Sequence, residues 1–190
     1  NMPKNIILRQ KCESQTIYQI GQTGPAGGIV FYDKGSYSLG WRYMECATTD
    51  LGFFEWGCAS ATTNANSPEI GKGLFNSATI INYHDSLINY YGNPSVCNAM
   101  NNGTVVAKNA LLFSSTTYDD WFLPTQNELE LMYQNLQLQG LGNFSNAKYW
   151  SSTEFDSGNV KTIDFNGGNV LTSPKIPSPN TTAARAVRSF

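Results

Sequence analysis

The pattern of hydrophobic and polar residues is clearest between residues 119 and 142. Residues 121–123 are apolar, as at the end of a strand, and Pro124 after them is tolerated in the first turn of a helix. Thr125 and Glu128 have the spacing of a capping box, in which each side chain binds the other residue's backbone N–H. Apolar residues then recur at helical spacing: Leu129, Met132, Tyr133 and Leu136. The pattern predicts a strand followed by a core helix over residues 125–138, with no catalytic group.

Similar patterns predict the remaining elements. β-branched and aromatic residues indicate strands within 28–33, 40–47, 149–154, 160–165, 169–172 and 184–190. Apolar residues at rough helical spacing indicate helices within 74–91 and 95–113. Helices in the middle and strands at both ends predict an α+β fold with antiparallel sheets, two to three helices and long loops. We expect the first and last strands to pair, so that the N- and C-terminal strands are adjacent.

Two segments divide the chain: an N-terminal arm, residues 1–20, and one domain, residues 21–190. The arm mixes Lys4, Arg9 and Lys11 with apolar residues 6–8, so a short amphipathic helix and a linker both fit it. Residues 21–27 contain two Gly-X-Y triplets, too few for a collagen helix, and predict a turn before the first strand.

Residues 48–73 have the composition of a long loop with embedded aromatic side chains. Phe53, Phe54 and Trp56 either pin this loop to the body of the domain or form an exposed platform that stacks on sugar rings. The sequence leaves both interpretations open.

Composition and charge exclude several classes of function. The chain has 190 residues and a net charge of −2, so it lacks the global basic field that nucleic acid attracts, and we expect no nucleic-acid partner. Its apolar runs are too short to span a bilayer, so we expect no membrane insertion. No signal peptide is visible, and we expect the chain to be a piece of a longer protein.

Cysteine and histidine are poorly arranged for metal or triad chemistry. Cys12, Cys46, Cys58 and Cys97 show no zinc-ligand spacing, and His84 is the one histidine. A Cys46–Cys58 bridge, other pairings and buried free thiols all remain open. The adjacent carboxylates at 119–120 could coordinate calcium but are more typical of a solvated turn. We therefore expect no metal, no cofactor and no enzymatic activity.

Four motifs in order resemble one bacterial family, the domain found at the C-terminus of the Legionella collagen-like adhesin. They are Gly21-Gln22-Thr23-Gly24-Pro25-Ala26-Gly27-Gly28-Ile29-Val30-Phe31-Tyr32, then Asp120-Trp121-Phe122-Leu123-Pro124-Thr125 with Glu128-Leu129 and Met132-Tyr133, then Tyr149-Trp150-Ser151-Ser152-Thr153-Glu154, and finally Arg185-Ala186-Val187-Arg188-Ser189-Phe190. The resemblance covers roughly residues 18–190. It implies a C-type-lectin-like fold, export to the cell surface, a homotrimer and binding of sulfated glycosaminoglycans.

The matched residues would hold the fold rather than the ligand, with Arg188 and Glu154 as an expected internal ion pair. Two sequence features of related folds are missing from this chain. The Glu-Pro-Asn, Gln-Pro-Asp and Trp-Asn-Asp motifs of calcium-dependent lectins do not occur in it. No cysteine follows Cys97, which argues against the late reactive cysteine pair of formylglycine-generating enzymes.

The resulting hypothesis is a calcium-independent, cell-surface adhesin domain that binds sulfated polysaccharide. Lysine and arginine side chains would donate charge-assisted hydrogen bonds to sulfate. The expected ligand-binding residues are Lys148, Lys161, Lys175 and Arg185, joined by Lys4, Arg9 and Lys11. The alternative is a protein-binding display module whose variable loops lie within residues 156–182.

Overall fold

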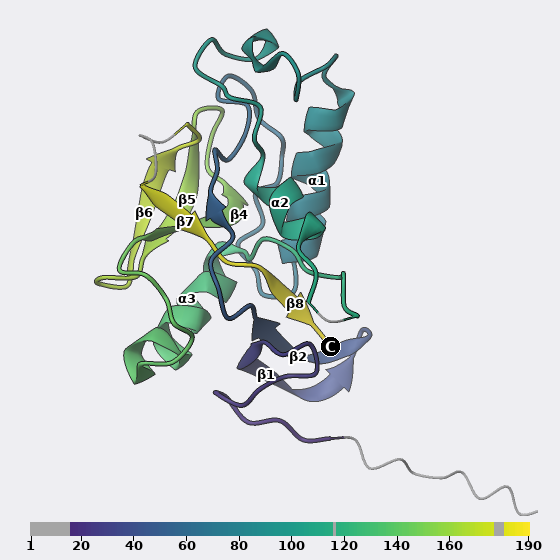
Figure 1. The fold of residues 1–190 in the computed structure, drawn as a ribbon, viewed down its shortest axis with the longest axis vertical. Helices are drawn as coiled ribbons and strands as arrows, with labels where there is room; N and C mark the ends of the chain where they lie inside the picture. The colour runs from purple at the N-terminus through teal and green to yellow at the C-terminus, as the bar shows by residue number, and fades with distance from the viewer. Residues whose placement is uncertain (1–15, 116, 177–180) are drawn as a thin grey trace, which may run out of the picture.

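The computed structural model describes residues 16–115, 117–176 and 181–190. Within them the chain is a mixed α+β structure with three α-helices and two sheets. The smaller sheet contains β1 (Ile29–Ser38), β2 (Trp41–Cys46) and β8 (Val187–Ser189), all antiparallel, in the order β1-β2-β8. Figure 1 shows this sheet at one end of the molecule, next to the end of β8.

The larger sheet has five strands in the order β3-β7-β4-β5-β6. These are β3 (Gly52–Phe53), β4 (Lys148–Glu154), β5 (Asn159–Asp164), β6 (Asn169–Pro174) and β7 (Thr182–Ala184). β4 pairs with β7 in parallel, and the other neighbours are antiparallel. The predicted hairpin at residues 166–168 connects β5 to β6.

Helices pack on both faces of β4. They are α1 (Gly73–Ser86), α2 (Val106–Leu112) and α3 (Gln126–Asn135), with short 3-10 turns η1 (Pro94–Val96) and η2 (Gln137–Gln139). Tyr149 packs with Leu129 of α3, whereas the next residue, Trp150, packs with Ile80 of α1. Because successive strand residues face opposite ways, the sheet lies between α3 on one side and α1 with α2 on the other. None of the helices in the described ranges is long and apolar enough to cross a bilayer.

The strand-to-helix junction forms largely as predicted. The backbone N–H of Glu128 donates to Thr125 Oγ1 at 3.2 Å, and Thr125 N–H donates to Glu128 Oε2 at 2.8 Å, so the capping box is confirmed. The prediction of a strand before this helix is wrong, because residues 121–123 form only an isolated bridge between Phe122 and Val187. A three-residue β8 offers too short a partner for a longer ladder.

Two other predicted elements differ from the structure. The helix expected within 95–113 forms as the shorter α2, because the buried carboxylate of Glu55 accepts the N–H groups of Asn102 and Gly103 and holds the segment before α2 as a loop. The first and last strands do not pair directly, since β2 lies between them. Glu45 of β2 is opposite Arg188 of β8, and their ion pair of 2.8 Å joins these strands.

The long loop over residues 48–73 is pinned by Trp56. This side chain is fully buried, and its Nε1 donates to the carbonyl of Ser151 at 2.8 Å. Phe53 is half exposed on the short β3 strand. Of the two interpretations of the loop aromatics, the anchoring one holds for Trp56.

Candidate functional site

Lys175 lies inside the protein, which contradicts its expected role in contacting sulfate. Its Nζ is 2.6 Å from Glu154 Oε1 and donates to the carbonyl of Ala61 at 2.7 Å. Glu154 also accepts the N–H groups of Thr63 and Asn64. The ammonium group is thus held by internal acceptors, because a buried charge is stable only when it is paired and hydrogen-bonded.

Arg185 is also buried and bound from several sides. Its guanidinium contacts Asp50 Oδ1 at 2.7 Å and donates to the carbonyls of Ala47, Gly142 and Asn143. The expectation that Arg185 binds a polysaccharide is therefore wrong. Its planar fork instead joins the end of β2 to the loop before β4.

The remaining predicted cations do not form one surface. Lys148 is opposite Asp164 in the β4–β5 pair, and Lys161 is three residues before Asp164, so alternation places the two lysines on opposite faces of the sheet. Lys161 Nζ donates to Thr172 Oγ1 at 3.0 Å. Lys4, Arg9 and Lys11 lie outside the described residues.

Arg188 pairs with partners other than the expected Glu154. Its Nη1 is 2.8 Å from Glu45 Oε1, and its Nε is 2.6 Å from Asp120 Oδ1. A second hydrogen bond from Nη2 takes the other oxygen of Asp120, so both oxygens of that carboxylate already accept from Arg188. Among the described residues, no group of three or more His, Cys, Asp and Glu side chains could hold a metal ion.

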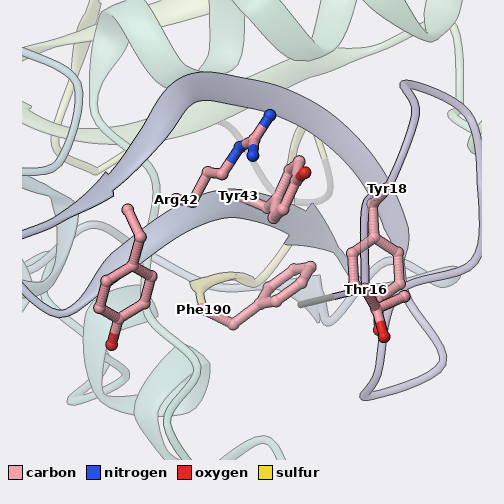
Figure 2. Close-up of a pocket in the computed structure, with 6 residues that line it drawn as sticks. Thr16, Tyr18, Arg42, Tyr43 and Phe190 are labelled. Atoms are coloured by element: carbon pink, nitrogen blue, oxygen red, sulfur yellow. The ribbon is translucent and has the colours of Figure 1, made fainter. Parts of the chain in front are cut away.

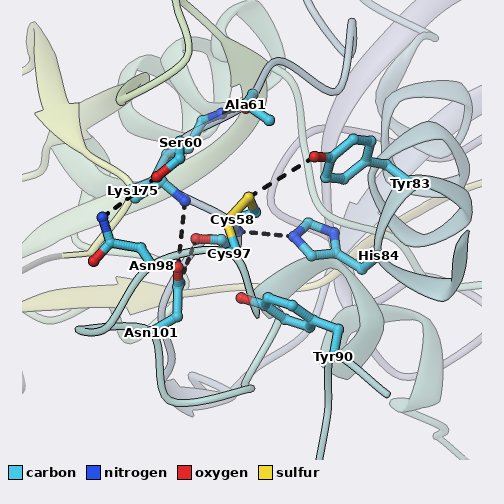
Figure 3. The surroundings of a disulfide bond; sticks show 12 residues. Cys58, Ser60, Ala61, Tyr83, His84, Tyr90, Cys97, Asn98, Asn101 and Lys175 are labelled. Atoms are coloured by element: carbon cyan, nitrogen blue, oxygen red, sulfur yellow. Dashed lines mark hydrogen bonds between the residues drawn. A yellow bond between two sulfur atoms is a disulfide. The ribbon is translucent and has the colours of Figure 1, made fainter. Parts of the chain in front are cut away.

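The disulfide joins Cys58 to Cys97, with Cα atoms 5.6 Å apart (Figure 3). The Cys46–Cys58 bridge, one of the pairings left open by the sequence, does not form. Cys46 is a buried free thiol that packs beside β1 and α3, whereas Cys58 packs near α1. His84 Nε2 accepts the N–H of Cys58 at 2.8 Å, and burial lowers the pKa of His84. This histidine is a neutral structural residue with both ring nitrogens engaged, since Nδ1 lies 2.7 Å from the carbonyl of Ile80.

On one face of the β1–β2 hairpin, a lysine side chain lies over an indole ring. Lys34 Nζ lies 3.7 Å from the ring centroid of Trp41, and Tyr32 lies beside the same ring at 6.2 Å between centroids. Gly71 packs so closely that a Cβ there would be 3.0 Å from Trp41 Cζ2. The exposed Lys72 follows directly. We call the surface of Lys34, Trp41 and Lys72 the Trp41 face.

The other face of the hairpin carries a pocket of about 190 Å³, shown in Figure 2. We call it the Arg42 pocket, and its lining residues are Thr16, Tyr18, Tyr37, Arg42, Tyr43 and Phe190. The rings of Tyr18, Tyr43 and Phe190 contact one another, with centroids 5.2 to 5.6 Å apart.

Charge in the Arg42 pocket is internally balanced. Arg42 Nε and Nη2 donate to the two carboxylate oxygens of Asp33 at 2.8 and 2.9 Å. This pairing holds the pKa of Asp33 below its usual value. The hydroxyl of Tyr43 is buried and has no hydrogen-bond partner among the described residues.

Strand alternation alone does not predict the two surfaces, because Arg42 and Tyr43 are neighbours in β2 and both line the Arg42 pocket. Trp41 instead packs with Tyr32 and Met44 in the core cluster that includes residues of α3. Lys34 and Lys72 form no motif in the sequence, and the contacts of Lys34 and Gly71 with Trp41 depend on the packing of β1, β2 and the segment before α1.

Comparisons with known proteins add no relative to this description. No protein-family model matches the chain. No curated protein matches it either.

Proposed function

We propose that this chain is a non-enzymatic adhesin domain that binds sulfated polysaccharide without calcium, and that the Trp41 face is its contact surface. The observation that carries the proposal is the contact of Lys34 with the partly exposed Trp41, whose ring also packs against Gly71, the residue before the exposed Lys72. The binding site that we propose therefore lies at the β1–β2 hairpin. The sequence had instead suggested the lysines of the β4–β6 region and Arg185.

The chemistry of the Trp41 face fits a sulfated sugar chain. Lys34 Nζ donates to the carbonyl of Ser38, which leaves two of its three N–H groups for other acceptors. Lys72 is exposed, and its ammonium group has no ion pair or hydrogen bond within the described residues. Charge-assisted hydrogen bonds from both lysines would hold sulfate groups, and Trp41 would position Lys34, whose ammonium group lies over the indole ring.

Other features support the wider setting of this proposal. β2 pairs with both β1 and β8, which brings the two ends of the described domain into one sheet, as a C-type-lectin-like fold requires. A disulfide such as Cys58–Cys97 is typical of proteins in oxidising compartments, which supports export to the cell surface. We extend the proposal to a homotrimer, whose repeated sites would add avidity and whose mass is directly measurable.

Retention on immobilised heparin tests the proposed site. The double variant Lys34→Gln/Lys72→Gln should elute at clearly lower salt than the unaltered protein, because two donors to sulfate are removed. A calcium chelator should leave the elution unchanged. Lys148→Gln/Lys161→Gln is the control with the same change in net charge.

Three outcomes would count against the proposal. Failure of the unaltered protein to bind at low salt removes polysaccharide binding altogether. If the control variant lowers the eluting salt concentration as much as the Trp41-face variant does, the binding is unspecific charge attraction. An effect of the control pair alone places the ligand on β4 and β5.

The second candidate is a protein-binding display module, favoured by exposed apolar side chains around the β5–β6 hairpin. Phe155 before β5 is 58% exposed, and Val170 in the edge strand β6 is 41% exposed. Phe155→Ser/Val170→Ser should abolish capture of a protein partner in this case while heparin retention stays unchanged. A captured partner that is insensitive to this double variant would remove the candidate.

A further inference from the structure

The Arg42 pocket differs in electrostatics from the Trp41 face on the opposite side of the hairpin. Lys34 and Lys72 have no carboxylate partner among the described residues, whereas Arg42 is bound through two hydrogen bonds to both oxygens of Asp33. A guanidinium paired in this way contributes little net charge. Its Nη1 forms no hydrogen bond to any described residue, so it remains a directional donor.

The pocket lining combines aromatic faces with hydroxyl groups. The rings of Tyr18, Tyr43 and Phe190 supply the apolar surface. Thr16 and Tyr37 add hydroxyl groups, and Tyr37 donates its own proton to the carbonyl of Gly40, so its oxygen remains an acceptor. A ligand that fits this lining needs an apolar face and several polar groups at its edge.

The size of the pocket limits the ligand to one ring. Its volume of about 190 Å³ is smaller than the roughly 300–1,000 Å³ of sites for drug-sized ligands. In Figure 2, Tyr43 and Phe190 lie side by side and Tyr18 closes one end of the group.

We propose that the Arg42 pocket binds a single uncharged sugar ring. A pyranose has C–H faces that pack against aromatic rings and a belt of hydroxyl groups that bind Arg42 Nη1 and the Tyr37 oxygen. This site is separate from the proposed polysaccharide surface and does not depend on it.

An aromatic side chain from a protein partner fits the pocket less well. It would pack against the three rings but leave Arg42 Nη1 and the lining hydroxyls without new hydrogen bonds. Unmatched polar groups in a closed contact weaken binding. The balance of ring faces and hydrogen-bonding groups therefore favours a sugar.

NMR titration of the whole chain tests the pocket with four probes: glucose, galactose, mannose and N-acetylglucosamine. At least one should shift the signals of Tyr43 and Phe190, with an affinity that is the same at low and high salt. Tyr18→Ala should weaken that binding by about tenfold, since it removes one packing ring. Tyr32→Ala, on the Trp41 face, is the matched control and should leave the affinity unchanged.

The result is separable from the heparin experiment. Tyr18→Ala should leave heparin retention unchanged, and Lys34→Gln/Lys72→Gln should leave the sugar affinity unchanged. The sugar proposal is overturned if none of the four sugars shifts the pocket signals, or if binding survives Tyr18→Ala or disappears at high salt. Binding of N-acetyl-tyrosinamide in place of all four sugars would overturn it in favour of a peptide partner.

Discussion

Lys175 Nζ lies 2.6 Å from Glu154 Oε1, and both side chains are buried. The pair joins the end of β6 to β4, and its remaining hydrogen bonds hold residues 61–64 of the long loop. Lys175, which the sequence suggested as a ligand contact, therefore stabilises this loop from inside the protein.

Removal of Lys175 should destabilise the fold strongly. Lys175→Met leaves the buried carboxylate of Glu154 without its cation, and breaking a buried ion pair costs about 3–5 kcal/mol of unfolding free energy. Urea denaturation followed by tryptophan fluorescence measures the change. Lys161→Met is the control, because its ammonium group is partly exposed, and it should stay within about 0.5 kcal/mol of the unaltered protein.

A double variant tests whether Lys175 acts through Glu154. In Glu154→Gln/Lys175→Met the two effects should add to less than the sum of the single changes, since both remove the same interaction. Strict additivity would show that the two residues stabilise the fold independently.

Glu128 should make the stability depend on pH in a defined window. Burial raises the pKa of its carboxyl to about 7, from 4.5 for a free side chain. Between these values the folded protein binds the proton more tightly than the unfolded chain, so the contribution of Glu128 to stability falls as pH rises. The slope approaches about 1.4 kcal/mol per pH unit in the middle of the window. Unfolding free energies of the unaltered protein and Glu128→Gln, measured across this range, should diverge by that slope.

Other groups titrate nearby, so the difference between proteins is the informative quantity. Burial also raises the pKa of Glu55, which gives a slope of the same sign. Burial lowers the pKa of His84, which makes stability rise with pH up to its ordinary value. Glu130→Gln on the same helix is the control with the same change in charge. Parallel curves for the unaltered protein and Glu128→Gln would show that Glu128 does not titrate in this window.

The Cys58–Cys97 bond should contribute substantially to stability. It closes a loop across a sequence separation of 39 residues, for which restriction of the unfolded chain predicts about 4 kcal/mol. Cys58→Ala/Cys97→Ala should lose about 2–4 kcal/mol, and a reducing agent should lower the stability of the unaltered protein but not of the variant. A variant as stable as the oxidised protein would show that Glu55 and its hydrogen bonds hold residues 101–103 without the disulfide.

Two Asn-Gly pairs should age at different rates. Deamidation requires the glycine nitrogen to attack the asparagine side-chain carbonyl. At Asn102-Gly103 that nitrogen donates to buried Glu55 at 3.0 Å, and Asn102 Oδ1 accepts from Thr104. At Asn166-Gly167 the corresponding donor bond is longer, 3.3 Å to the carbonyl of Asp164, in an exposed turn.

Peptide mapping by mass spectrometry after incubation at mildly alkaline pH measures both sites. Asn166 should convert to aspartate and isoaspartate well before Asn102. Glu55→Gln should speed conversion at Asn102 but not at Asn166. Equal rates in the unaltered protein would contradict the protective role of Glu55.

Local signals in the sequence predicted local structure well. The capping box of Thr125 and Glu128 lies within four consecutive residues, and α3 begins at it as predicted. The expected helix over 74–91 shortens to α1, which ends at Ser86. The start of the helix within 95–113 could not be predicted from local signals, because Glu55, a residue far earlier in the chain, holds the first half of that segment as a loop.

The candidate site depended on contacts that the sequence does not display. Arg185 and Asp50 are separated by 135 residues, and Lys175 and Glu154 by 21. Whether a cation is exposed or buried depends on such distant partners, and composition cannot reveal them. Alternation along β2 does not separate the two surfaces, since the neighbours Arg42 and Tyr43 share one pocket, and the approach of Gly71 to the indole is a contact of the folded chain.

The position of Tyr18 beside Tyr43 and Phe190 has a mechanical consequence. The chain enters the domain at the small sheet that carries the Arg42 pocket. Tension between a ligand held in the Arg42 pocket and the segment before Thr16 would load β1, β2 and β8 alone. The five-stranded sheet, the helices and the Cys58–Cys97 bond would remain outside the path of the force.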